Sequence, residues 1–313
     1  MSRLAELHSQ ASSLRPRAES QFRGLRLSAG AGIWACADQD GLPALLISQS
    51  PGGAKAAGLQ LRNFQVAFGV DAVIDEGARS SADTFAILST PDPSPAVVSF
   101  FWAACESILG LLGPQPTAYE ISVATLGVAD LFARLNRQPT GSLIGLCGEL
   151  LFILAADVPA SWVDRWREDP TEAWDFLDSG VRLDVKATSG QIRAHEVSFL
   201  QTNPPRDTTA WLASVLVRRA AGGEGVVDLM EHVLRAGGLS PAQALKVQRV
   251  VADTLGTDID NQMRIDVASS VDSILLFKAS EVPAIRGDLP TGVTQVRFVS
   301  EFDFASGTSI SGL

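Results

Sequence analysis

At 313 residues, the chain has enough material for one large or two ordinary domains with a buried core. Its content of 46% apolar and 19% charged residues excludes extensive disorder, and no apolar run approaches the roughly 18 residues of a membrane span. The formal net charge of −10 excludes a generic nucleic-acid coat, because binding to phosphates depends on clustered lysine and arginine.

The cysteines indicate the compartment. Cys36, Cys105 and Cys147 are far apart in the sequence and lack the close pairing of zinc sites and disulfide frameworks. We interpret them as small core residues. The N-terminal segment is rich in arginine but has no apolar stretch followed by a cleavage site. Together these features predict a cytoplasmic protein with no membrane partner.

The first part of the chain, residues 1–112, predicts a β-rich unit. Apolar alternation and turn residues predict a helix over 4–14, strands over 32–37, 44–48, 59–68 and 85–88, and a closing helix over 96–112. The sequence assigns no role to this unit, so recognition, dimerisation and partner docking stay open.

A proline-rich break, Gly113-Pro114-Gln115-Pro116, is the predicted boundary to a second domain over residues 113–313. Helical spacing follows over 118–135, and Ser142 is well placed to cap another helix that ends near residue 156. This second helix carries Glu149 among leucines and Phe152. A carboxylate in so apolar a segment is unusual.

The central part of the second domain predicts strands over residues 173–177, 181–188, 196–202 and 211–219. The turn Asp178-Ser179-Gly180 makes the first two a hairpin, which brings Asp175 near the strand that carries Asp184. Alternation along that strand places Asp184 and Lys186 on one face. Helices over 226–235 and 241–255 and strands over 273–278 and 293–300 complete the domain.

Three acids and one amine converge in this arrangement: Glu149, Asp175, Asp184 and Lys186. Carboxylates at one sheet edge form a site suited to Mg²⁺, which takes one or two carboxylates together with water and phosphate oxygens. The lysine, one of only four in the chain, would orient the attacking water and neutralise developing negative charge. The chemistry that this predicts is metal-dependent phosphodiester hydrolysis.

Each of these residues also has a purely structural interpretation. Glu149 can lie on the solvent side of an ordinary helix, and the two aspartates can be edge-strand charges that discourage aggregation. Lys186 can form a structural salt bridge with Asp184 or Glu149. An acid two residues before a lysine arises by chance roughly 0.45 times in a chain of this composition, so the placement of the acids carries the argument.

The segment resembles the PD-(D/E)XK nuclease superfamily. In the residues of its motifs it resembles an uncharacterised bacterial family of PD-(D/E)XK motif proteins. The resemblance rests on four features of residues 141–202: Gly145-Leu146-Cys147-Gly148-Glu149-Leu150, Trp174-Asp175-Phe176, Leu183-Asp184-Val185-Lys186-Ala187-Thr188, and Gln201 on the following strand. Trp174 replaces the name-giving proline, and Asp184 is the shorter of the two permitted acids. Neither departure removes a chemical group.

The resemblance implies an α/β fold, with a restriction-endonuclease-like core whose mixed central sheet is flanked by helices, beside the N-terminal β-rich unit. It implies that Asp175 and Asp184 bind Mg²⁺, or Mn²⁺ in its place, that Lys186 is the catalytic lysine, and that Glu149 is an accessory acid at the metal. Gln201 would be a supporting polar residue. The substrate would be nucleic acid, foremost double-stranded DNA, and restriction or phage defence the setting.

Two other functions stay open at this point. A catalytically silent nucleic-acid-binding or scaffolding subunit would keep the fold and act through partners. A hydrolase of small phosphate esters would use the same metal chemistry. The sequence also leaves open whether the chain acts alone, as a homodimer or with a partner subunit.

Overall fold

The computed structural model describes residues 2–15, 20–28, 32–49, 56–113, 115–169, 172–178, 180–205, 208–261 and 263–310. The chain forms two compact units, one comprising Met1–Pro139 and Leu255–Asp260, the other Thr140–Thr254 and Asn261–Leu313. This division lies later than the predicted boundary, part of which, Pro114, is outside the described residues. The reason is that helix α3 packs against helix α2 and the short helix η1 of the first unit.

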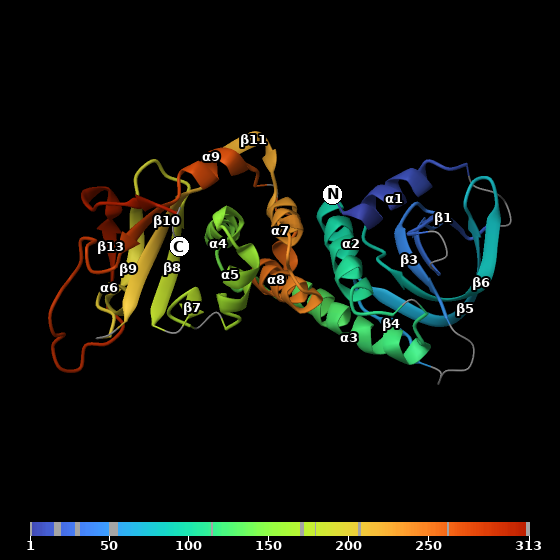
Figure 1. Ribbon diagram of the computed structural model, residues 1–313, viewed down its shortest axis with the longest axis horizontal. Helices are drawn as coiled ribbons and strands as arrows, with labels where there is room; N and C mark the ends of the chain where they lie inside the picture. The colour runs from blue at the N-terminus through green and yellow to red at the C-terminus, as the bar shows by residue number, and fades with distance from the viewer. Residues whose placement is uncertain are drawn as a thin grey trace. The chain divides into compact units, whose positions relative to one another are not determined.

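The first unit is built around a β-sheet, as its β-rich sequence predicts. Its described elements are α1 (Arg3–Ser12), β1 (Phe22–Arg26), β2 (Ile33–Ala37), β3 (Pro43–Ser48), β4 (Leu59–Gln60), β5 (Gln65–Asp75), β6 (Ser80–Ser89), α2 (Pro95–Leu109), α3 (Ala118–Leu135) and η1 (Gly256–Asp258). The strand order is β1-β2-β3-β6-β5-β4, and β1 also pairs in parallel with β5, so the sheet closes into a barrel (Figure 1).

Closure of this barrel depends on a glycine. A Cβ atom on Gly24 of β1 would lie 2.4 Å from Cys36 Sγ and 2.8 Å from Ile74 Cγ2. Only glycine therefore lets β1 approach the interior this closely.

Cys36, Cys105 and Cys147 are all buried free thiols, as their isolation in the sequence predicts.

The second unit holds the predicted site. Its described elements are α4 (Leu143–Ala155), α5 (Pro159–Arg165), β7 (Phe176–Asp178), β8 (Val181–Thr188), β9 (Ala194–Ser198), α6 (Phe199–Thr202), β10 (Thr209–Leu216), β11 (Arg219–Glu224), α7 (Val226–Arg235), α8 (Pro241–Leu255), α9 (Val267–Asp272), β12 (Leu275–Lys278), β13 (Arg297–Glu301), η2 (Phe302–Phe304) and β14 (Thr308–Ser309).

The sheet of this unit has the order β14-β12-β10-β8-β7, with β8 and β10 parallel and the other neighbours antiparallel. Helix α4 packs on one face, and the β9–β13 pair lies over the other (Figure 1). This mixed sheet flanked by helices confirms the predicted α/β class. No helix within the described ranges is long and apolar enough to cross a membrane.

Helix α4 approaches the sheet closely because of a second glycine. A Cβ atom on Gly148 would lie 2.6 Å from Ala187 Cβ and 3.3 Å from Val185 Cγ1 on β8. The helix begins where the sequence predicts, with Ser142 Oγ accepting a hydrogen bond from the Gly145 amide. The neighbour of Gly148, Glu149, is thereby held next to the sheet.

Several predicted elements have different bounds in the structure. The predicted strand over 196–202 ends at Ser198, and Gln201 lies on helix α6 instead, so its assignment to a strand was wrong. The physical reason is a capping box: Ser198 Oγ accepts from the Gln201 amide, and Gln201 Oε1 accepts from the Ser198 amide. The hairpin of β7 and β8 forms as predicted, although Ser179 of its turn lies outside the described residues.

Candidate functional site

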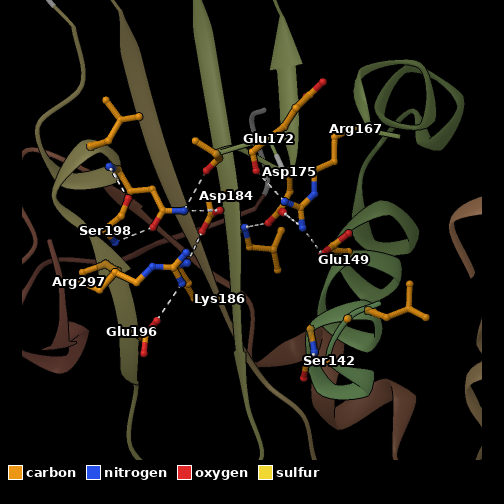
Figure 2. Close-up of a pocket in the computed structure, with 18 of the residues that line it drawn as sticks. Ser142, Glu149, Arg167, Glu172, Asp175, Asp184, Lys186, Glu196, Ser198 and Arg297 are labelled. Carbon is orange, nitrogen blue, oxygen red and sulfur yellow. Dashed lines mark hydrogen bonds and ion pairs between the residues drawn. The ribbon is translucent and has the colours of Figure 1, made fainter. Parts of the chain in front are cut away.

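The five residues singled out from the sequence line one cavity of about 900 Å³ in the second unit (Figure 2). They are Glu149, Asp175, Asp184, Lys186 and Gln201. Strand β8, helices α4 and α6 and the residue before β7 supply them. The structure therefore brings together side chains that span more than 50 positions of the sequence.

Asp184 and Lys186 project from β8 on the face opposite α4. The register shows this, because Asp184 pairs with Leu212 of β10, a member of the core cluster beneath β9. Lys186 Nζ lies 2.9 Å from Asp184 Oδ2. The same oxygen is buried and, among the residues that the structure describes, its close partner is Lys186 in this ion pair.

The second oxygen of Asp184 is fixed by an amide. Gln201 Nε2 donates to Asp184 Oδ1 at 2.7 Å and to the carbonyl of Ala173 at 3.0 Å. Because the capping box holds the other end of the Gln201 amide, Asp184 has one fixed orientation. Gln201 thus supports the site from a helix rather than from a strand.

Asp175 lies where the β7–β8 hairpin opens. The last ladder pair is Phe176 with Leu183, and beyond it the Asp175 carboxylate takes a backbone position: its Oδ2 accepts from the Val185 amide at 2.6 Å. Its Oδ1 lies 2.8 Å from a terminal nitrogen of Arg167. The short strand β7 therefore leaves the edge of β8 open just where the acids gather.

Glu149 reaches the same place from helix α4. Its Oε2 accepts a hydrogen bond of 2.6 Å from the indole of Trp166, and its Oε1 lies 3.6 Å from Arg167. Figure 2 shows the Arg167 side chain extending between Asp175 and Glu149. Glu149 therefore faces the buried site and is not a solvent-side helix residue.

The three carboxyl groups share a low-dielectric site. Burial raises the pKa of Glu149, Asp175 and Asp184 above their ordinary values, because an ionised carboxylate loses hydration there. For Asp175 the nearby charges of Asp184 and Glu149 raise the pKa further, while Arg167 lowers it. Perturbed acids in a cavity are typical of functional sites.

Arg167 and Trp166 are the site residues that sequence reasoning missed. They follow helix α5 in a segment without periodicity, so no pattern marks them. A bridge between Trp166 and Phe176 and a hydrogen bond of 2.8 Å from the Arg167 amide to the Asp175 carbonyl align this segment with β7. The only signal in the sequence was a tryptophan followed by an arginine, shortly before an acidic strand.

The chemistry of the donors fits a hard divalent cation. Three carboxylates lie on adjacent elements, and one of their oxygens, Asp184 Oδ2, is buried beside the Lys186 ammonium. Oxygen donors of this kind are the ones that Mg²⁺ prefers. Among the residues that the structure describes, however, no three His, Cys, Asp or Glu side chains stand in metal-binding geometry. The donor set is suitable for a cation, although Arg167 and Lys186 form ion pairs with one oxygen of each carboxylate.

Comparison with known proteins finds a family model that matches most of the chain. The model of a family described as "Putative PD-(D/E)XK family member (DUF4420)" matches residues 11–303. No curated protein and no solved structure matches the chain. Because the match includes all the strands of the barrel and every candidate site residue, and extends over far more than half of the sequence, the chain belongs to this PD-(D/E)XK family.

Proposed function

We propose that the protein is a Mg²⁺-dependent nuclease, foremost an endonuclease that cuts double-stranded DNA in restriction or phage defence. The observation that carries the proposal is the convergence of three buried carboxylates and Lys186 in one cavity. Family membership supports a nuclease-like fold. Mn²⁺ would serve in place of Mg²⁺.

The charge of the cavity supports a cation-dependent reaction. Its described lining includes seven acidic side chains and three basic ones, Arg167, Lys186 and Arg297. Such a surface repels a phosphate group unless a bound cation offsets the excess negative charge. A phosphodiester would therefore enter this cavity only together with a divalent cation.

Each residue has a definite part in the proposed reaction. Asp175 and Asp184 would hold the metal, with Glu149 beside them, and the metal would stabilise the charge that develops on the phosphate. The Lys186 ammonium would orient the attacking water and offset negative charge at the reacting phosphate. Gln201 keeps Asp184 in one orientation.

A cleavage assay tests the proposal. Supercoiled plasmid, linear duplex, single-stranded DNA and RNA are incubated with the protein and Mg²⁺ or Mn²⁺. We expect metal-dependent cleavage of duplex DNA, reduced about 10²-fold or more in Asp184→Asn and Lys186→Met. The matched control is Lys278→Met, because Lys278 lies on β12 of the same sheet, pairs with Glu281 and does not line the cavity.

Absence of cleavage of every substrate, or equal cleavage by Asp184→Asn, would overturn the nuclease. The second candidate is then a non-catalytic nucleic-acid-binding or scaffolding protein, which the occupation of Asp175 and Glu149 by Arg167 favours. It predicts salt-dependent DNA binding in a gel-shift assay without turnover.

A further inference from the structure

The six carboxylate oxygens of the site divide into two sets. One oxygen of each acid is held by an uncharged donor, namely the Trp166 indole, the Val185 amide or the Gln201 amide. The other oxygen of each acid faces a cation: Arg167 for Glu149 and Asp175, and Lys186 for Asp184. The uncharged donors fix the orientation of the acids, and the cations supply the opposite charge.

Arg167 is the cation with two acidic partners. One terminal nitrogen lies 2.8 Å from Asp175 Oδ1 and 3.6 Å from Glu149 Oε1, which places positive charge where these carboxylates converge. The other terminal nitrogen donates to the Glu172 carbonyl at 2.9 Å. A divalent cation that used the same two oxygens would have to take the place of this nitrogen.

We propose that Arg167 is the built-in counter-ion of the metal-free site and competes with the divalent cation for Asp175 and Glu149. This inference rests on the proposed metal-dependent function of the same site. Arg167 keeps the buried acids paired when metal is scarce, and metal entry moves its guanidinium off them. The apparent metal affinity is therefore lower than the three acids alone would give.

The surroundings of Arg167 permit this movement. Its side chain is 24% exposed and lines the cavity, whereas the Asp175 side chain is only 4% exposed. The bond to the Glu172 carbonyl involves the nitrogen that does not touch the acids, so it can persist as an anchor while the guanidinium leaves Asp175. The displaced charge then stays in the cavity, where a phosphate would lie.

Direct metal binding tests the inference without any activity measurement. Isothermal titration calorimetry of the chelator-treated full chain with Mg²⁺ or Mn²⁺ alone compares wild type with Arg167→Gln. We expect the variant to bind metal about tenfold more tightly or better, because a competing unit charge is gone. Arg165→Gln is the matched control: it removes the same charge two residues earlier, where Arg165 pairs with Asp178 outside the cavity lining.

A second variant and a second readout guard against loss of folding in Arg167→Gln. Arg167→Lys keeps the charge and is expected to stay within about threefold of the wild-type metal affinity. In the wild type, Mg²⁺ is expected to shift the Nε–H resonance of Arg167, assigned by its absence in Arg167→Lys. The Arg165 resonance is expected to stay unchanged.

The outcomes separate this inference from the proposed function. The counter-ion role is wrong if Arg167→Gln binds metal no more tightly than wild type. It is also wrong if metal leaves the Arg167 resonance unshifted while Asp184→Asn loses metal binding. In both cases the metal site stands. If wild type and Arg167→Gln both fail to bind metal, the metal-dependent function fails and the inference with it.

Discussion

Two buried polar clusters lie on neighbouring strands of the second unit, and they differ in how their charges are matched. One of them, here called the matched cluster, is centred on Arg193, which donates to the carbonyl and the hydroxyl of Ser214 at 2.9 Å each and to the Ser273 carbonyl at 2.5 Å. The Ser214 hydroxyl also bonds to His195 Nε2 at 2.7 Å, and Asp303 lies beside Arg193. None of these side chains lines the described cavity.

The carboxylate cluster has the opposite character. Its three acids repel one another, carry raised pKa values and open into a cavity. Burial of polar groups is therefore common to both clusters, and only mutual repulsion beside an open volume distinguishes the candidate site. The matched cluster stabilises the fold, whereas the carboxylate cluster destabilises it until a ligand offsets the repulsion.

The largest effect is expected from removing the centre of the matched cluster. Arg193→Met leaves two carbonyls and the Ser214 hydroxyl without their donor, so we expect the free energy of unfolding to fall by about 3 kcal/mol. Urea denaturation followed by circular dichroism measures it. Cleavage per folded molecule stays at the wild-type value; a lasting loss of cleavage would assign this cluster to the site.

The converse change is Asp175→Asn in the carboxylate cluster. We expect cleavage to fall about 10²-fold while stability is kept, because one of three repelling charges is removed and the amide oxygen can still accept from Val185. Ser214→Ala is the control, with cleavage within about twofold of wild type. Stability lost in Asp175→Asn with unchanged cleavage would reverse the assignment of the two clusters.

Acid should weaken the matched cluster through His195. Burial, with the charges of Lys186 and Arg193, lowers the pKa of His195 from 6.5 to about 4 in the folded protein. The stability from neutral His195 is therefore present above pH 6.5 and is lost as the pH falls toward 4, by about 2 kcal/mol between pH 7 and pH 5. In urea denaturation, the free energy of unfolding of His195→Gln should fall by about 2 kcal/mol less than that of the wild type over the same pH change. Equal decreases in the two proteins would refute the prediction.

The smallest effect concerns the support of Glu149. Trp166→Phe keeps the aromatic packing and removes the indole donor, so we expect cleavage and Mg²⁺ affinity to fall about tenfold, as for other groups that orient metal ligands. Trp162→Phe is the matched control, because Trp162 packs on Phe152 away from the cavity lining. Wild-type Mg²⁺ affinity in Trp166→Phe would show that the indole does not position Glu149.

Local patterns in the sequence predict much of both units. Strand β8 and helix α3 have the predicted bounds, because period-two alternation and a Thr117-Glu120 capping box are local signals. The sequence also marked Glu149, Asp175, Asp184, Lys186 and Gln201 as candidate site residues, and their chemical roles stay a proposal. Their meeting in one cavity follows from the hairpin register and the close approach at Gly148.

What the sequence could not supply depends on tertiary pairing. Gln201 lies on a helix because a two-residue capping exchange with Ser198 outweighs strand propensity. Arg167 and Trp166 become site residues only through pairing with the β7 segment, which leaves no periodic signal. The two compact units divide after α3, because α3 packs against α2 across the proline-rich break between them.

Crystals soaked with Mn²⁺ and measured at its absorption edge test the central claim most directly. We predict an anomalous peak within about 2.5 Å of oxygens of both Asp175 and Asp184, with Arg167 moved off Asp175, and no such peak in Asp184→Asn. An anomalous map whose peaks all lie elsewhere, with the Arg167–Asp175 ion pair intact, would contradict a metal site in this cavity.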